Sequence, residues 1–176
     1  LKFDRRLMAN LDESTQREYI RTNRKGAYCC SSIVGCNTRK YHGVLVIPVP
    51  ELSENNHVLL SSLDLTIVQH GVPFNVGIHE YEGDIFSPKG HKYIREYNVD
   101  IASSTTYRVG GVVLQKEFLF CHYTNRMLQR YTLLEAHSRT TLRLSPFLAF
   151  RDVKMLTHRN DQYHGDYGQA KSGVTF

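Results

Sequence analysis

The stretch EYIRTNRKGAYCCSSIVGCNTRKYHGVLVIP, residues 18–48, decides the fold of this chain. It contains three short runs rich in β-branched or aromatic residues, which are typical of strands: 19–22, 28–34 and 44–48. Glycine-containing segments at 23–26 and 35–38 separate these runs and predict tight turns. Because antiparallel strands can be joined by tight turns, the stretch predicts an antiparallel meander.

The same pattern continues through the rest of the chain. Strand-like runs recur at about ten-residue spacing, at 63–69, 74–79, 91–101, 107–109, 112–120, 127–134 and 140–148. The only helix signal is a short turn over 13–17 that Asp12 could cap. We therefore predict an all-β fold with little helix, a large antiparallel β-sandwich in which residues 1–176 form a single domain.

The cysteines and the hydropathy pattern place the protein in the cytoplasm. The chain has four cysteines: Cys29, Cys30, Cys36 and Cys121. They are too few for a disulfide framework, and they lack the C-x2-C spacing of a zinc site. We therefore expect intracellular free thiols. Charge begins at Lys2, which excludes a secretory signal, and no apolar run approaches the ~18 residues of a membrane span. We expect no membrane partner, no cofactor and no metal.

Two further features suggest partners that we do not favour. The net charge of +5 could favour nucleic acid, but Lys and Arg alternate with Asp and Glu and form no long basic block, so we expect no nucleic-acid partner. His158 and His164 flank Asp161 and could hold a divalent ion, but a polar loop is the reading that we favour.

The turn at residues 37–43, NTRKYHG, has more hydrogen-bonding groups than a turn requires. Arg39 offers a planar fork of donors, and His42 can donate or accept, which suits a hydroxyl-rich ligand or a neighbouring carboxylate. In the alternative, structural interpretation, Asn37 and Thr38 fasten the turn while Arg39 and His42 tie adjacent loops together. The sequence leaves both interpretations open.

Tyrosines and carboxylates supply the other candidate site residues. Tyr93 and Tyr97 share one face of the expected strand 91–101, where their rings could stack on a sugar, although a half-buried sheet face is the interpretation that we favour. Glycoside hydrolysis needs two carboxyls on either side of a sugar. The carboxylates beside loops are better explained as solvated charge: Asp64, Glu80, Glu82, Asp84, Asp152 and Asp161.

Four motifs resemble the N-terminal domain of bacterial and archaeal glycogen debranching enzymes, the amylo-α-1,6-glucosidase family. They are TNRKGAY at 22–28, NTRKYHGVLV at 37–46, LLSSLD at 59–64 and PFLAFRDVKMLTHRN at 146–160. The chain departs from the family where Arg24 to Ala27 replace a Gly-Leu-Gly-Gly turn and where Tyr19 replaces the usual Trp.

The resemblance implies a β-sandwich of the supersandwich type that precedes an (α/α)6-barrel glucosidase. The barrel carries the catalytic carboxylates in the family, so we expect a non-catalytic, C-terminally truncated piece of a longer enzyme and assign no catalytic residue. Its expected partners are the downstream barrel and an α-glucan, either glycogen or a limit dextrin. The residues expected to contact the glucan or the barrel are Asn37, Arg39, Tyr41, His42, Arg151 and Asp152.

Two other functions compete with this one. One is a resident 4-α-glucanotransferase activity, for which a β-rich chain of 176 residues is short. The other is a stand-alone oligomerisation or nucleic-acid-binding module. The sequence does not decide whether the domain forms a homodimer.

Overall fold

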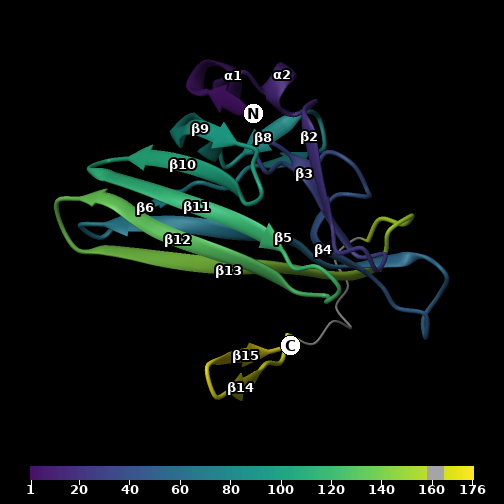
Figure 1. Cartoon of the computed structure of the whole chain (residues 1–176). Helices are drawn as coiled ribbons and strands as arrows, with labels where there is room; N and C mark the ends of the chain where they lie inside the picture. Colours follow the sequence, from purple (N-terminus) through teal and green to yellow (C-terminus); the bar gives the residue numbers. More distant parts are fainter. Residues whose placement is uncertain (158–164) are drawn as a thin grey trace.

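Two antiparallel sheets face each other in the computed structural model, which describes residues 1–157 and 165–176 (Figure 1). The first sheet has the order β1 (Lys2–Asp4), β9 (Ile94–Asn98), β10 (Ser103–Val109), β11 (Val112–Phe120) and β12 (Met127–Ala136). The second has the order β13 (Thr140–Asp152), β5 (Asn56–Gln69), β4 (Gly43–Pro48), β3 (Tyr28–Ser32) and β2 (Glu18–Thr22), with β6 (Val72–Asn75) also on β5. The predicted all-β sandwich is confirmed.

Short elements complete the fold. Two small hairpins stand outside the sheets, β7 (His79–Tyr81) with β8 (Ile85–Ser87), and β14 (Gly168–Ala170) with β15 (Gly173–Thr175). The helices are α1 (Arg5–Ala9), α2 (Leu11–Ser14) and the 3-10 helix η1 (Gly90–Tyr93). The longest helix among the described residues has five residues, far fewer than the ~20 that a membrane span requires.

Two expectations about these elements are wrong. The helical turn does not run over 13–17 behind Asp12; α1 begins after Asp4, whose side chain accepts a hydrogen bond from the Leu7 N–H at 3.1 Å, and α2 ends at Ser14. The expected strand 91–101 is interrupted, because its first residues form η1 and only 94–98 pair in the sheet. The alternation of side chains at 91–97 therefore does not mark one continuous face.

The core lies between the sheets, where alternate residues of the long strands face inward. Leu65 and Ile67 of β5 meet Leu114 of β11 in one cluster, and each is at most 3% exposed. Burying a side chain of this size contributes about 1.5–3 kcal/mol. The period-2 pattern of β5 and β11 thus sets which sheet faces pack together.

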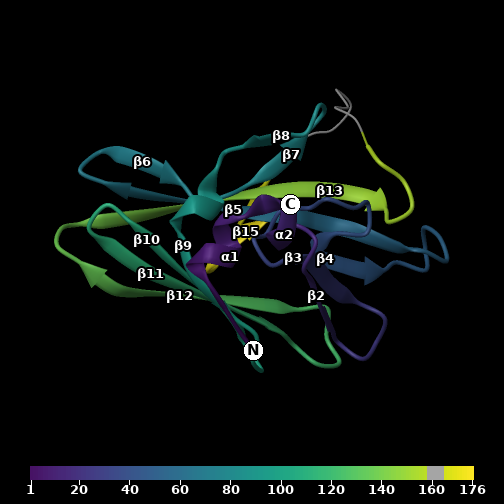
Figure 2. The ribbon, with the colours of Figure 1, turned by 90° about the horizontal axis from the view of Figure 1, so that it is seen from above.

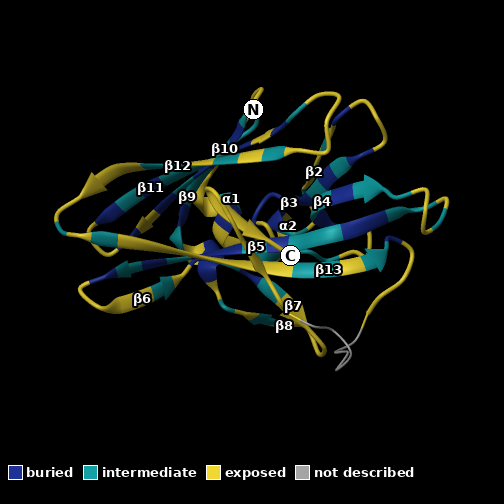
Figure 3. Cartoon of the chain, turned by 90° about the horizontal axis from the view of Figure 1, so that it is seen from below, coloured by how far each residue is buried: buried dark blue, intermediate teal, exposed yellow. Residues whose placement is uncertain are grey.

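One side of the sandwich is open. In the part of the chain that the structure describes, β12 is an edge strand of the first sheet and β13 an edge strand of the second, and Figure 3 shows both largely exposed. Leu133 pairs with the buried Leu114, and Leu144 pairs with the buried Leu65, so both point toward the interior. They are nevertheless 49% and 44% exposed. An apolar surface therefore remains uncovered along these two edges.

Candidate functional site

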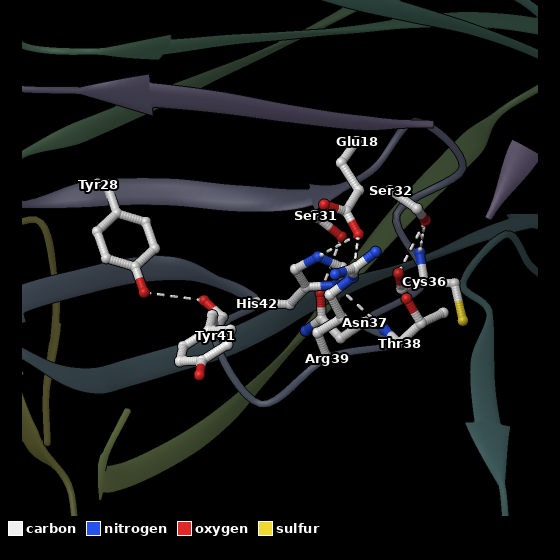
Figure 4. Close-up of polar contacts among 10 residues, drawn as sticks. All are labelled: Glu18, Tyr28, Ser31, Ser32, Cys36, Asn37, Thr38, Arg39, Tyr41 and His42. Atoms are coloured by element: carbon white, nitrogen blue, oxygen red, sulfur yellow. Dashed lines mark hydrogen bonds and ion pairs between the residues drawn. The ribbon is translucent and has the colours of Figure 1, made fainter. Parts of the chain in front are cut away.

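Asn37 fastens the turn between β3 and β4 to the neighbouring strand. Its side-chain amide donates to the carbonyl and hydroxyl oxygens of Ser61 on β5, at 2.9 and 3.2 Å, and its Oδ1 accepts from Ser31 Oγ on β3 at 2.8 Å. Figure 4 shows Asn37 lying beside Ser31 within this network. These hydrogen-bond partners of the Asn37 side chain all lie within the domain, as the structural interpretation predicts.

His42 is also used inside the domain. The residue is 1% exposed, and its Nδ1 accepts a hydrogen bond from the Thr38 N–H at 3.1 Å (Figure 4). The proton of the neutral ring is therefore on Nε2, which lies 3.3 Å from Glu18 Oε1. Burial lowers the pKa of His42, and the nearby Glu18 carboxylate offsets this in part. The imidazole is a neutral support for the turn.

Glu18, Cys30 and His42 place three potential metal ligands within 4.8 Å of one another. Their chemistry does not suit a cation. The Thr38 N–H occupies the Nδ1 lone pair of His42, so Nε2 keeps its proton. Burial raises the pKa of the Cys30 thiol, and Arg39 Nε lies 2.6 Å from Glu18 Oε1. The cluster is an ion pair beside a buried histidine.

Three consecutive residues of the turn face outward. The Arg39 side chain is 63% exposed while it pairs with Glu18. Tyr41 is 48% exposed, and Lys40 Nζ lies 5.5 Å from the centre of its ring. Only the backbone of Tyr41 is held, because its carbonyl accepts from the Tyr28 hydroxyl at 3.0 Å (Figure 4). These side chains are available to a ligand or to another domain.

The end of β13 clamps the turn from the other side. Arg151 donates to the carbonyl oxygens of Lys40 and Met155, both at 2.7 Å. Asp152 accepts from the Lys154 N–H at 2.8 Å and from the Asn55 amide at 2.9 Å. The Lys154 N–H is the main cause that lowers the pKa of Asp152, with Asn55 next. Asp152 is thus an ionised structural acceptor rather than a proton donor.

A groove of about 480 Å³ lies between this turn and the β7–β8 hairpin. One wall is cationic and consists of Arg39, Lys40 and Arg151. The opposite wall is acidic and consists of Glu80, Glu82 and Asp84, with the ring of Tyr81 beside them. The sequence interpretation missed this acidic wall, because a hairpin some forty positions from the turn is brought to it only by the fold.

Tyr93 and Tyr97 do not form a sugar platform. Tyr97 is 3% exposed and packs between the rings of Phe3 and Tyr19, with centroids at 6.3 and 6.0 Å. Tyr93 lies in η1, is partly buried against the core and meets Phe74 edge-on at 6.3 Å. The stacking alternative is wrong, because Tyr97 lies in the core and Tyr93 packs against it. His158, Asp161 and His164 lie outside the described residues.

Comparison with known protein families identifies the family of this chain. The sequence profile of the family described as "Glycogen debranching enzyme N terminal" matches residues 17–176. The chain belongs to this family. No curated protein and no solved structure matches it. The family match includes the turn, the groove and every strand from β2 to β15, so these are features of the N-terminal domain of a glycogen debranching enzyme.

Proposed function

We propose that this domain is a non-catalytic part of a glycogen debranching enzyme that packs on a downstream glucosidase barrel and forms one wall of its α-glucan cleft. The observation that carries the proposal is the groove beside residues 37–42. Its framework is fixed by internal bonds of Asn37, His42 and Arg151, whereas Arg39 and Tyr41 remain exposed. A rigid support that presents exposed polar groups is the usual design of a binding site.

The charges of the groove suit a neutral, hydroxyl-rich ligand. Three cationic side chains face three acidic ones, so the wall offers donors and acceptors without a net charge. Its volume of about 480 Å³ falls within the range of small-molecule sites. A phosphate-rich polymer would instead favour a uniformly basic wall. The balance supports an α-glucan over a nucleic acid.

The same groove does not support hydrolysis by this domain. Glycoside hydrolysis needs two carboxyls on opposite sides of the sugar, roughly 5–9.5 Å apart. The acids that line the groove all belong to the segment 80–84, and the wall opposite them is cationic. This arrangement supports a binding role, with the chemistry supplied by the barrel.

The uncovered edge of β12 and β13 supports the packing role. Leu133 and Leu144 point toward the interior of the sandwich yet are 49% and 44% exposed, and exposed apolar surface of this kind is typical of an interaction site. A neighbouring domain would cover them.

The four cysteines are all free thiols, which supports a cytoplasmic location.

Glucose release from a limit dextrin tests this function. The purified 176-residue chain is expected to release no glucose, whereas a longer polypeptide that includes the barrel is expected to release it. Chromatography of maltooligosaccharides incubated with the chain examines transferase activity in the same experiment. Glucose or disproportionation products formed by the chain alone would contradict the proposal.

A further inference from the structure

A second set of exposed aromatic side chains adjoins the groove. Phe147 of β13 and Tyr81 of β7 are 47% and 55% exposed. The ring of His79 contacts both, with centroids 5.2 Å from Phe147 and 6.4 Å from Tyr81. Figure 2 shows the β7–β8 hairpin beside β13, which brings these segments together. We call Phe147, His79 and Tyr81 the aromatic row.

A buried carboxylate of the domain fixes the orientation of His79, the central residue of the aromatic row. His79 Nε2 lies 2.8 Å from Asp64 Oδ2, and Asp64 is only 8% exposed. Since a carboxylate only accepts, the Nε2–H donates and the ring is oriented by a buried group. Ser62 Oγ donates to the other oxygen of Asp64 at 3.3 Å. The orientation of His79 is therefore built into the fold.

Gly77 leaves the space that this pair requires. A Cβ at position 77 would lie 2.7 Å from Asp64 Oδ2, closer than real Cβ contacts allow. Gly77 has no positive φ, so its backbone conformation does not require a glycine. A side chain here would push the Asp64 carboxylate away from His79.

We propose that the aromatic row is a stacking site for the glucose rings of an α-glucan, and that it continues the groove through their shared residue Tyr81. Aromatic faces offer apolar plates for the C–H faces of a sugar, while the adjoining polar walls bond its hydroxyls. The inference rests on the proposed glucan contact and names its stacking residues.

Titration of the ¹⁵N-labelled chain with maltoheptaose tests the site by NMR. We expect shifts at residues 79–84 and 147, and we expect Phe147→Ala and Tyr81→Ala each to weaken binding by about two- to tenfold. Tyr123→Asn is the matched control. It removes a 57% exposed tyrosine that also neighbours a histidine, and asparagine tolerates its positive φ of 61°. The control is expected to bind as the unaltered chain does.

The outcomes separate this inference from the proposed function. If maltoheptaose binds and Arg39→Ala weakens it but Phe147→Ala and Tyr81→Ala do not, the stacking site is overturned while the groove stands. If the chain does not bind maltoheptaose at all, both glucan contacts are overturned. Phe147→Tyr keeps an aromatic plate and is expected to retain binding, which distinguishes stacking from a loss of folding.

Discussion

Two residues of the turn 37–43, only two positions apart, have different roles. Asn37 bonds β3 to β5 through Ser31 and Ser61, so it is structural. Arg39 makes one partly exposed ion pair with Glu18 and otherwise faces solvent. The structural interpretation is therefore confirmed for Asn37, whereas the binding role of Arg39 stays a prediction.

Alanine substitutions at these two positions should differ in their effect on stability. Asn37→Ala leaves the polar groups of Ser31 and Ser61 without their partner and is expected to lower the free energy of unfolding by about 1–3 kcal/mol. Arg39→Ala removes an exposed ion pair and is expected to cost less than about 1 kcal/mol. Urea unfolding of both variants measures this. Equal losses would contradict the assignment.

Stability should fall in mild acid because of His42. Burial lowers its pKa in the folded state, so the unfolded chain binds more protons and stability is lost as the pH falls below about 6.5. His91 is shifted in the same direction by burial and adds to the effect. Urea midpoints between pH 7.5 and pH 5.5 measure the slope. His42→Gln is expected to flatten it, and an unchanged slope would show that His42 is not held neutral.

The roles of single residues could be predicted only in part. The motif NTRKYHG identified the turn, since its polar groups are contiguous in sequence. The full burial of Tyr97 goes beyond the half-buried face that the sequence favours, because alternation along a strand does not say how completely a face is covered. The aromatic row could not be predicted either, because Phe147 and His79 are distant in sequence and their rings meet only where β13 and β7 come together.

At the scale of elements, the hairpins and long strands follow from period-2 patterns and turn residues. β5 pairs with β6 and β10 with β11 through tight turns between consecutive strand-like runs. The segment 80–90 lies between two expected strands, 74–79 and 91–101, yet it includes β8 and part of β7. Strands of three residues carry too short a pattern to be distinguished from a loop.

The edge strands β12 and β13 should make the isolated chain self-associate. Their exposed leucines and free backbone edges favour contacts between copies. We expect Leu142→Lys with Leu144→Lys to lower the apparent mass at high protein concentration. Sedimentation equilibrium measures this, with Ile101→Lys, an 85% exposed residue off these strands, as the control. Association unaffected by the double substitution would contradict this role of the edges.

At the scale of the whole molecule, the sandwich supports two surfaces with different chemistry. The apolar edge suits packing against another domain, and the groove with its balanced charges suits a sugar chain. The sandwich class could be predicted from strand spacing alone. The two surfaces could not, since each is assembled from elements whose relative positions depend on sheet order.

The central claim is that the groove serves the debranching enzyme without carrying its chemistry. The most direct test is glucose release from a limit dextrin by the enzyme that contains this domain, with and without Arg39→Ala. We expect kcat/KM to fall by about fivefold, as for the loss of one hydrogen-bonding side chain, with the urea midpoint nearly unchanged. An unchanged kcat/KM in the Arg39→Ala enzyme would contradict the account, and so would a variant that no longer folds.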